Sequence, residues 1–84
     1  FHLEGCASLK EKRQRLSGLR DRFGRQTNVA VCESGEPDAL QRAEWSFVVV
    51  AGTRAIADKQ VADIETFVAE SLDARVSGRE LEYL

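Results

Sequence analysis

The stretch Trp45-Ser46-Phe47-Val48-Val49-Val50 is the most strand-like part of this 84-residue chain. Aromatic and β-branched side chains suit the pleated, half-buried surface of a sheet. Gly52 follows closely and ends the strand, and Thr53 has the side chain of a helix N-cap. The centre of the chain therefore predicts a buried strand followed by a helix that runs to about Leu72.

A first helix is predicted upstream, from Ser8 to about Phe23. Ser8 and Glu11 have the spacing of a capping box, in which each side chain accepts a hydrogen bond from a free backbone amide of the first turn. Gly24 follows as a C-terminal stop. Both ends of this helix are thus marked by residues with a physical reason to be there.

Three further strands and a short helical turn are expected around the two helices. Alternation and β-rich composition place the strands at Phe1 to Glu4, Thr27 to Glu33 and Arg79 to Tyr83. In the second of these, Val29 and Val31 lie on one face. Turn-forming residues occupy 34–38, and residues 39–42 are expected to form one helical turn.

The predicted order is strand–helix–strand–strand–helix–strand. That is the split βαβ, or ferredoxin-like (βαββαβ), pattern of an α+β protein. Its sheet is antiparallel and four-stranded, with strands 1 and 3 in the middle and both helices on one face. Residues 1–84 are expected to form this single domain, with the first strand truncated at the N-terminus. Since so short a chain buries only about 60–65% of its unfolded surface, a homodimer is expected.

Composition places the chain among soluble globular proteins, with 43% hydrophobic residues, 31% charged residues and a net charge of −2. No run approaches the ~18 apolar residues of a membrane span, so no membrane partner is expected. Cys6, Cys32 and the single His have no metal-ligand spacing, so neither a metal nor a cofactor is expected. The thiols are interpreted as small buried hydrophobes in a reducing, cytoplasmic setting.

The net charge conceals an asymmetry along the chain. Residues 1–25 hold seven Lys or Arg against three acids, whereas residues 26–84 hold five against eleven. This division can indicate an anionic partner for the basic first helix. It can equally indicate that the basic and acidic helices attract each other within the fold.

Lys12 falls on the apolar side of the first helix, where the periodicity calls for a hydrophobic residue. The apolar arc is formed by Leu9, Leu16, Leu19 and Phe23. A lysine there must reach solvent or acquire a partner. One hypothesis is a structural ion pair with Glu4 or Glu44. The other is an anion site, with RNA as a candidate ligand, in which Lys12 acts with Ser8, Lys10 and Arg13 near the helix N-terminus.

The predicted sheet has one face that the helices leave open. If Phe47 and Val49 face the helices, the opposite face is small, partly apolar and nearly uncharged, which suits packing against another sheet. This candidate self-association face consists of Ala30, Cys32, Ser46, Val48 and Val50.

Several short motifs resemble the bacterial YlxP-like family of small proteins of unknown function. They are Leu3, Ser8-Leu9-Lys10-x-Lys12-Arg13, Asn28-Val29-x-Val31 and Asp38-x-x-Gln41-Arg42-Ala43-Glu44 before the valine-rich strand. The chain departs from the family pattern at Glu4, Leu40 and Trp45. The resemblance implies a cytoplasmic ferredoxin-like domain in a translation or ribosome context, and it supplies no catalytic residues.

Catalysis is not expected, because no nucleophile–base pair, metal cluster or Gly-rich phosphate loop is present. His2 and the pair Glu80 and Glu82 are interpreted as surface residues. The sequence predicts a non-enzymatic, RNA- or ribosome-associated protein that binds through its basic first helix. Because the third strand lacks the aromatic motif of sheet-type RNA readers, binding would depend on phosphates and on salt. The alternative is a homo-oligomeric interaction module that uses the open sheet face.

Overall fold

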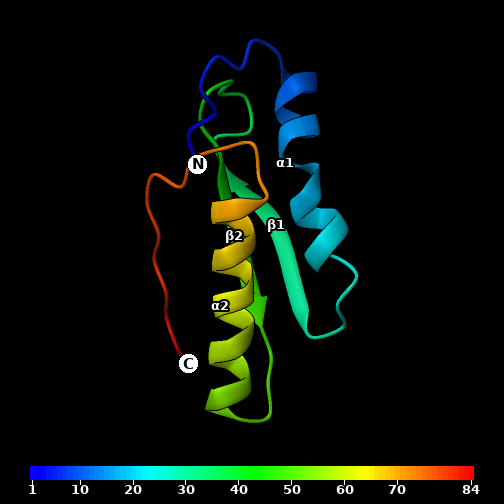
Figure 1. The fold of residues 1–84 in the computed structure, drawn as a ribbon, viewed down its shortest axis with the longest axis vertical. Coiled ribbons are helices and arrows are strands. Elements are labelled where there is room, and N and C mark those ends of the chain that lie inside the picture. Colours follow the sequence, from blue (N-terminus) through cyan, green and yellow to red (C-terminus); the bar gives the residue numbers. More distant parts are fainter.

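The computed structural model describes all residues from 1 to 84. Its elements are, in order, helix α1 (Leu9–Phe23), strand β1 (Val29–Gly35), strand β2 (Glu44–Val49) and helix α2 (Arg54–Glu70). The strands form an antiparallel hairpin, and the helices cover one side of it (Figure 1). The C-terminal segment runs back along the side of α2 that faces away from α1 (Figure 1).

Both helices begin where their caps predicted. Ser8 Oγ accepts a hydrogen bond from the Glu11 amide at 3.0 Å, and Glu11 Oε2 accepts one from the Ala7 amide at 3.0 Å. Thr53 caps α2 with a single bond, in which its hydroxyl oxygen accepts from the Ile56 amide. Gly24 is the C-cap of α1 but has a right-handed φ of −66°. A glycine fits there because an added Cβ would lie only 2.5 Å from the Arg20 carbonyl oxygen.

The hairpin confirms the two central strands. Val31 is paired with Phe47 and Glu33 with Trp45, and an irregularity follows between Glu33 and Gly35. Exposure alternates along β2, since Trp45, Phe47 and Val49 are half-buried between exposed neighbours. The alternation shows that one face of the hairpin packs against the helices.

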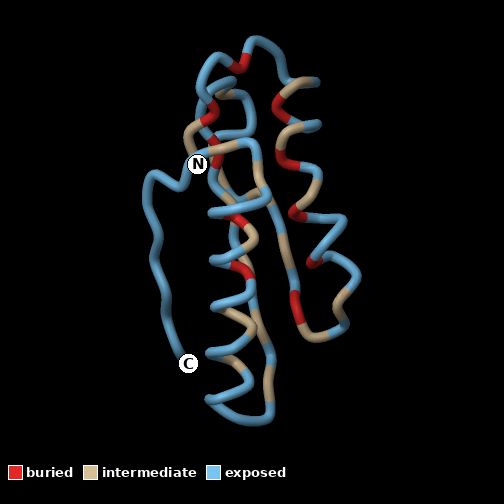
Figure 2. The backbone as a smooth tube through the Cα atoms, in the orientation of Figure 1, coloured by how far each residue is buried: buried red, intermediate tan, exposed pale blue.

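The core joins the two helices, the hairpin and the N-terminal residues (Figure 2). The Phe23 ring meets Phe47 edge-on at 5.8 Å between centroids and Phe67 at 5.3 Å. It therefore links α1 to both β2 and α2. The buried apolar residues are Leu3, Cys6, Leu16, Leu19, Phe23, Val29, Ala43, Ile64 and Val68.

The prediction of a four-stranded ferredoxin-like sheet is wrong, because only β1 and β2 form a sheet. In the N-terminal segment, His2 alone makes isolated bridges, to Arg42 and to Arg75. Residues 76–84 form no strand, and residues 39–42 form no helical turn. The architecture is α+β with two helices and a two-stranded sheet.

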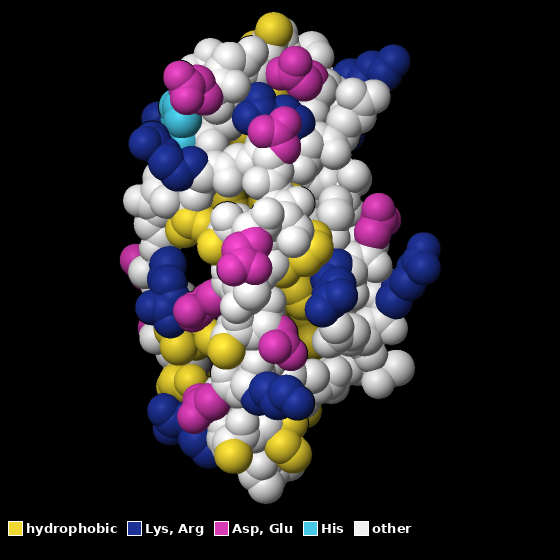
Figure 3. Space-filling model, viewed as in Figure 1, with side chains coloured by type: hydrophobic (Ala, Val, Ile, Leu, Met, Phe, Trp, Pro, Cys, Tyr) yellow, Lys and Arg dark blue, Asp and Glu magenta, His cyan; other side chains and the backbone are white.

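The C-terminal segment stays apart from the sheet because its side chains bind α2. Arg79 pairs with Glu65, and the Tyr83 hydroxyl donates to Asp58. The Arg54 guanidinium lies 3.5 Å from the centre of the Tyr83 ring. Figure 3 shows a hollow between this segment and the rest of the molecule. The alternating pattern that predicted a strand at 79–83 instead places Arg79 and Tyr83 on the side that contacts the helix.

Neither α1 nor α2 is both long and apolar enough to span a membrane.

Candidate functional site

Lys12 is buried, with 2% of its surface exposed. Its ammonium donates hydrogen bonds to the carbonyl oxygens of Glu36 at 2.8 Å and Ala39 at 2.7 Å. Glu33 Oε2 lies 3.6 Å from the same nitrogen. Two hydrogen bonds and a nearby carboxylate therefore compensate the charge of this buried ammonium within the protein.

The ion-pair partner of Lys12 is Glu33, and neither Glu4 nor Glu44 takes that place. The backbone carbonyl of Glu4 accepts a hydrogen bond from Arg15, and the Glu44 carboxylate accepts one from Ser34. Lys12 thus has an ion-pair partner within the protein, as one hypothesis expected, but the partner is Glu33. Glu33 follows Val29 and Val31 at intervals of two along β1, so strand alternation carries its side chain toward the helix side.

The Lys12 contacts hold the connection between β1 and β2 against α1. Glu36 has a φ of 53°, in the left-handed region that is uncommon for residues other than glycine. Its carbonyl oxygen is one of the two that Lys12 binds. The lysine therefore fixes a turn whose backbone would otherwise be costly to hold.

The other members of the predicted anion site have surroundings different from those of Lys12. The hydroxyl oxygen of Ser8 accepts the hydrogen bond that caps α1. Lys10 and Arg13 are exposed on α1, and neither is in an ion pair. The structure thus leaves Lys10 and Arg13 facing solvent, while Ser8 and Lys12 serve the fold.

The exposed cations of α1 form a row along one side of the helix. Lys10, Arg13 and Arg20 fall within an arc of about 80° at 100° per residue. All three are exposed, and none is in an ion pair. By contrast, Arg15 is largely buried and is bound to Asp73, Glu11 and the carbonyl of Glu4. We call Lys10, Arg13 and Arg20 the α1 row.

An open groove of about 530 Å³ lies beside the α1 row. From α1 it is lined by Lys12, Arg13, Leu16, Arg20 and Asp21, and from β2 by Trp45. Glu33 and Asp38 line it from β1 and the following turn. Cations, carboxylates and an aromatic ring therefore meet in one concave surface, which we call the α1 groove.

Trp45 is the aromatic residue of the α1 groove. The Arg20 guanidinium carbon lies 5.1 Å from the centre of its ring, within cation–π range. The indole Nε1 is buried and has no hydrogen-bond acceptor. The sequence placed Trp45 at the start of a strand and noted it as a departure from a family pattern, but nothing there revealed the contact with Arg20.

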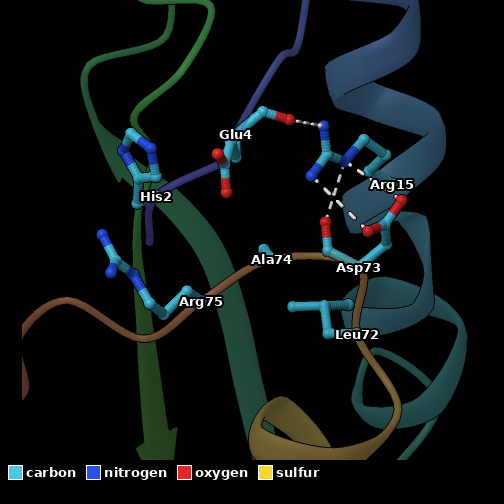
Figure 4. A pocket seen from close by; sticks show the side chains of 7 residues that line it. All are labelled: His2, Glu4, Arg15, Leu72, Asp73, Ala74 and Arg75. Atoms are coloured by element: carbon cyan, nitrogen blue, oxygen red, sulfur yellow. Dashed lines mark hydrogen bonds and ion pairs between the residues drawn. The ribbon is translucent and has the colours of Figure 1, made fainter.

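A second concave surface lies near the N-terminus, with a volume of about 560 Å³ (Figure 4). Figure 4 shows the Arg15 guanidinium held between Glu4 and Asp73, whereas His2 and Arg75 lie together on the other side. The partners of the Arg15 guanidinium thus lie within the protein. His2 has no hydrogen bond from its ring, which leaves it a surface residue of this pocket.

The open face of the hairpin carries the five residues that the sequence assigned to it. Ala30, Cys32 and Ser46 are exposed, and Val48 and Val50 are 61% and 68% exposed. The neighbouring Ser34 hydroxyl donates to Glu44 and accepts from Ser46. The face is therefore apolar toward the Val50 end and polar toward the Glu44 end.

The charge asymmetry does not arise from paired helices, since no ion pair joins α1 to α2. The acidic partners of α1 are Glu11 in the same helix, Glu33 in β1 and Asp73 beyond the end of α2. On the face shown in Figure 3, acidic and basic side chains are interspersed. The cations of the α1 row consequently remain available to something outside the chain.

No three His, Cys, Asp or Glu side chains come together in a group that could hold a metal ion. A family model described as "Protein of unknown function (DUF503)" matches residues 1–80. No curated protein and no solved structure matches the chain.

Proposed function

The chain belongs to the DUF503 family of proteins of unknown function, and we propose that it is a non-enzymatic RNA-binding protein that acts in association with the ribosome. The observation that carries the proposal is the α1 row. Lys10, Arg13 and Arg20 are exposed on one side of a rigid helix and have no acidic partner. The resemblance to YlxP-like proteins, with its translation context and cytoplasmic setting, supports the same proposal.

The spacing of the α1 row suits a polyanion. Lys10 and Arg20 are ten residues apart, which is about 15 Å along a helix. Phosphates recur at regular intervals along a nucleic acid strand, so a row of this length can contact more than one of them. Lysine and arginine on such a row bind phosphate oxygens, and arginine can do so with two parallel hydrogen bonds.

Titration with fluorescently labelled ribosomal RNA fragments at low and moderate salt tests the proposal. Replacing the α1 row with K10Q, R13Q and R20Q together should weaken binding at least tenfold. It should also reduce the slope of log affinity against log salt by about 0.7 for each lost contact with single-stranded RNA. The matched control is K59Q, which removes an exposed, unpaired cation from α2. No binding at low salt would overturn the proposal, and so would equal losses for K59Q and the triple variant.

A second candidate function is self-association through the open sheet face, and the exposure of Val48 and Val50 favours it. Two copies packed face to face would bury these valines without burying a formal charge at the centre. The face is about 20 Å long and two strands wide. Since stable interfaces bury about 800 Å² on each partner, this surface alone supports only a weak homodimer.

Light scattering at protein concentrations from micromolar to submillimolar tests this second candidate. The mass should rise with concentration toward that of a dimer, and V48E should abolish the rise. A V76E variant, which places the same charge on an exposed valine outside the hairpin, should leave it intact. A constant monomer mass throughout would exclude the self-association.

A further inference from the structure

We propose that the α1 groove binds one unpaired guanine nucleotide of an RNA strand, an inference that rests on the proposed RNA-binding function. The ligand would stack against the Trp45 and Arg20 pair, be read by Asp38, and have its phosphate bound by the arginines of α1. Unpaired bases are the usual targets of sequence-specific RNA recognition, through stacking on aromatic rings or guanidinium planes.

The groove has a size and a charge pattern that fit a nucleotide better than a simple anion. Its volume of about 530 Å³ lies within the range of small-molecule sites. Its lining on α1 holds the cations Lys12, Arg13 and Arg20 together with Asp21. The carboxylates Glu33 and Asp38 line it from β1 and the following turn. A phosphate alone would be repelled by the carboxylates. A nucleotide offers an anionic group to one wall and base N–H donors to the other.

Trp45 supplies the observation that points most directly to a ligand. Its Nε1 donor is buried and has no acceptor in the protein. A buried donor without a partner is rare and costly, because it has lost water without gaining a hydrogen bond. Arg20 lies over the same ring and can move with its flexible stem. Because the indole N–H points along the plane of the ring, its acceptor would come from the ribose or phosphate of a nucleotide whose base stacks on the ring face.

Asp38 is the free carboxylate that lines the groove from the turn after β1, and Asp21, which is also exposed and unpaired, lines it from α1. Glu33 is engaged with Lys12, whereas Asp38 is exposed and makes neither an ion pair nor a side-chain hydrogen bond. An ionised carboxylate offers two acceptor oxygens side by side. Guanine presents two adjacent donors, N1–H and N2–H, on one edge. Cytosine, adenine and uracil cannot match both oxygens in this way.

The phosphate sites lie on either side of the base. Arg13 and Arg20 are seven residues apart, which is about 10.5 Å along the helix. The two side chains therefore leave α1 far enough apart for a nucleotide to lie between their points of attachment. Each arginine can then bind a phosphate flanking the base that occupies the groove.

The single tryptophan of the chain gives the inference a direct readout. Eight-residue oligomers of alternating guanosine and uridine should quench Trp45 emission and bind about tenfold or more tighter than oligouridine of equal length. D38N should remove this preference, and because it takes away a carboxylate that repels phosphates, it should not weaken the binding of oligouridine. The matched control D63N removes an exposed, unpaired carboxylate on α2 and should keep the preference.

The outcomes separate this inference from the function on which it rests. RNA that binds with the salt dependence expected of the α1 row but without guanine preference, or without a change in Trp45 emission, overturns the inference alone. A guanine preference that survives D38N also overturns it. Absence of all binding at low salt overturns both the inference and the proposed function.

Discussion

The ammonium nitrogen of Lys12 lies 3.6 Å from Oε2 of Glu33, joining the inner side of α1 to the last inward-facing residue of β1. With the carbonyls of Glu36 and Ala39, this contact holds the β1–β2 connection in place. Asp38 and Glu33 both line the α1 groove. The buried lysine lines the same groove, and its ammonium is bound to groups of the protein that position the groove wall.

Replacing Lys12 should destabilise the fold strongly. In K12M, Glu33 and the carbonyl oxygens of Glu36 and Ala39 lose their partner. We expect unfolding free energy to fall by about 2–3 kcal/mol, since Glu33 keeps some access to water. Urea denaturation followed by circular dichroism measures the change. K10M, on the exposed side of the same helix, should stay within about 0.5 kcal/mol of the parent. Equal stability of K12M and the parent would contradict a structural role for Lys12.

The outer edge of β2 should exchange its amide hydrogens quickly. The amide of Val50 donates a hydrogen bond to the carbonyl oxygen of Asn28, which precedes β1. Because amides of a strand point alternately to its two sides, those of Ser46 and Val48 also point toward β1. The amides of Trp45, Phe47 and Val49 then point toward the edge of the hairpin that has no partner strand. Hydrogen exchange measured by NMR should show fast exchange at these three and protection at Ser46 and Val48. Uniform protection along β2 would mean that the edge is covered.

The two helices and the hairpin could be predicted from the sequence because their signals are local. Ser8 and Thr53 mark the helix starts with side chains that bond their own first turns. The valine-rich strand and its partner each alternate clearly. The outer strands could not be predicted in this way, since a strand exists only if another backbone pairs with it. His2 pairs at one position, and residues 79–83 are held by α2 instead.

The candidate site was partly accessible from the sequence. Periodicity identified Lys12 as a cation on an apolar face, and the structure buries it there. Its partner could have been found by extending the alternation of Val29 and Val31 to Glu33. The contacts of Lys12 with the carbonyls of Glu36 and Ala39 could not have been found from the sequence, because the path of a loop depends on tertiary packing. The same holds for the contact between Arg20 and Trp45, which joins residues on separate elements.

The contact between Tyr83 and Asp58 should exist only within a window of pH. The hydrogen bond between them raises the pKa of the Tyr83 hydroxyl and lowers the pKa of the Asp58 carboxyl. A raised folded-state pKa stabilises the contact below the ordinary tyrosine value, and this stabilisation is lost as pH rises through the raised pKa. The lowered pKa of Asp58 stabilises the contact above the ordinary aspartate value, and this is lost as pH falls through the lowered pKa.

Ultraviolet absorbance of the single tyrosine measures the alkaline limit. Its ionisation should occur above the ordinary range of tyrosine, and D58N should move it back toward that range. D63N, which alters a carboxylate of α2 that does not contact Tyr83, should have no effect. If Tyr83 of the parent protein ionised within the ordinary range of tyrosine, this result would contradict the docking of the C-terminal segment on α2.

The two cysteines should differ sharply in reactivity. Cys32 is exposed on the open sheet face, whereas Cys6 is 2% exposed within the core. Burial, followed by a hydrogen bond with Glu11, raises the pKa of the Cys6 thiol, so little of the reactive thiolate forms near neutral pH. A thiol reagent such as DTNB should therefore label Cys32 quickly and Cys6 only as the chain unfolds. C32S should remove the fast phase and C6A the slow one.

If two copies meet through the open sheet face, the labelling rate of Cys32 should fall as protein concentration rises, while that of Cys6 does not change. A Cys32 rate that is independent of concentration, in a sample shown by light scattering to be dimeric, would place the dimer contact elsewhere on the molecule.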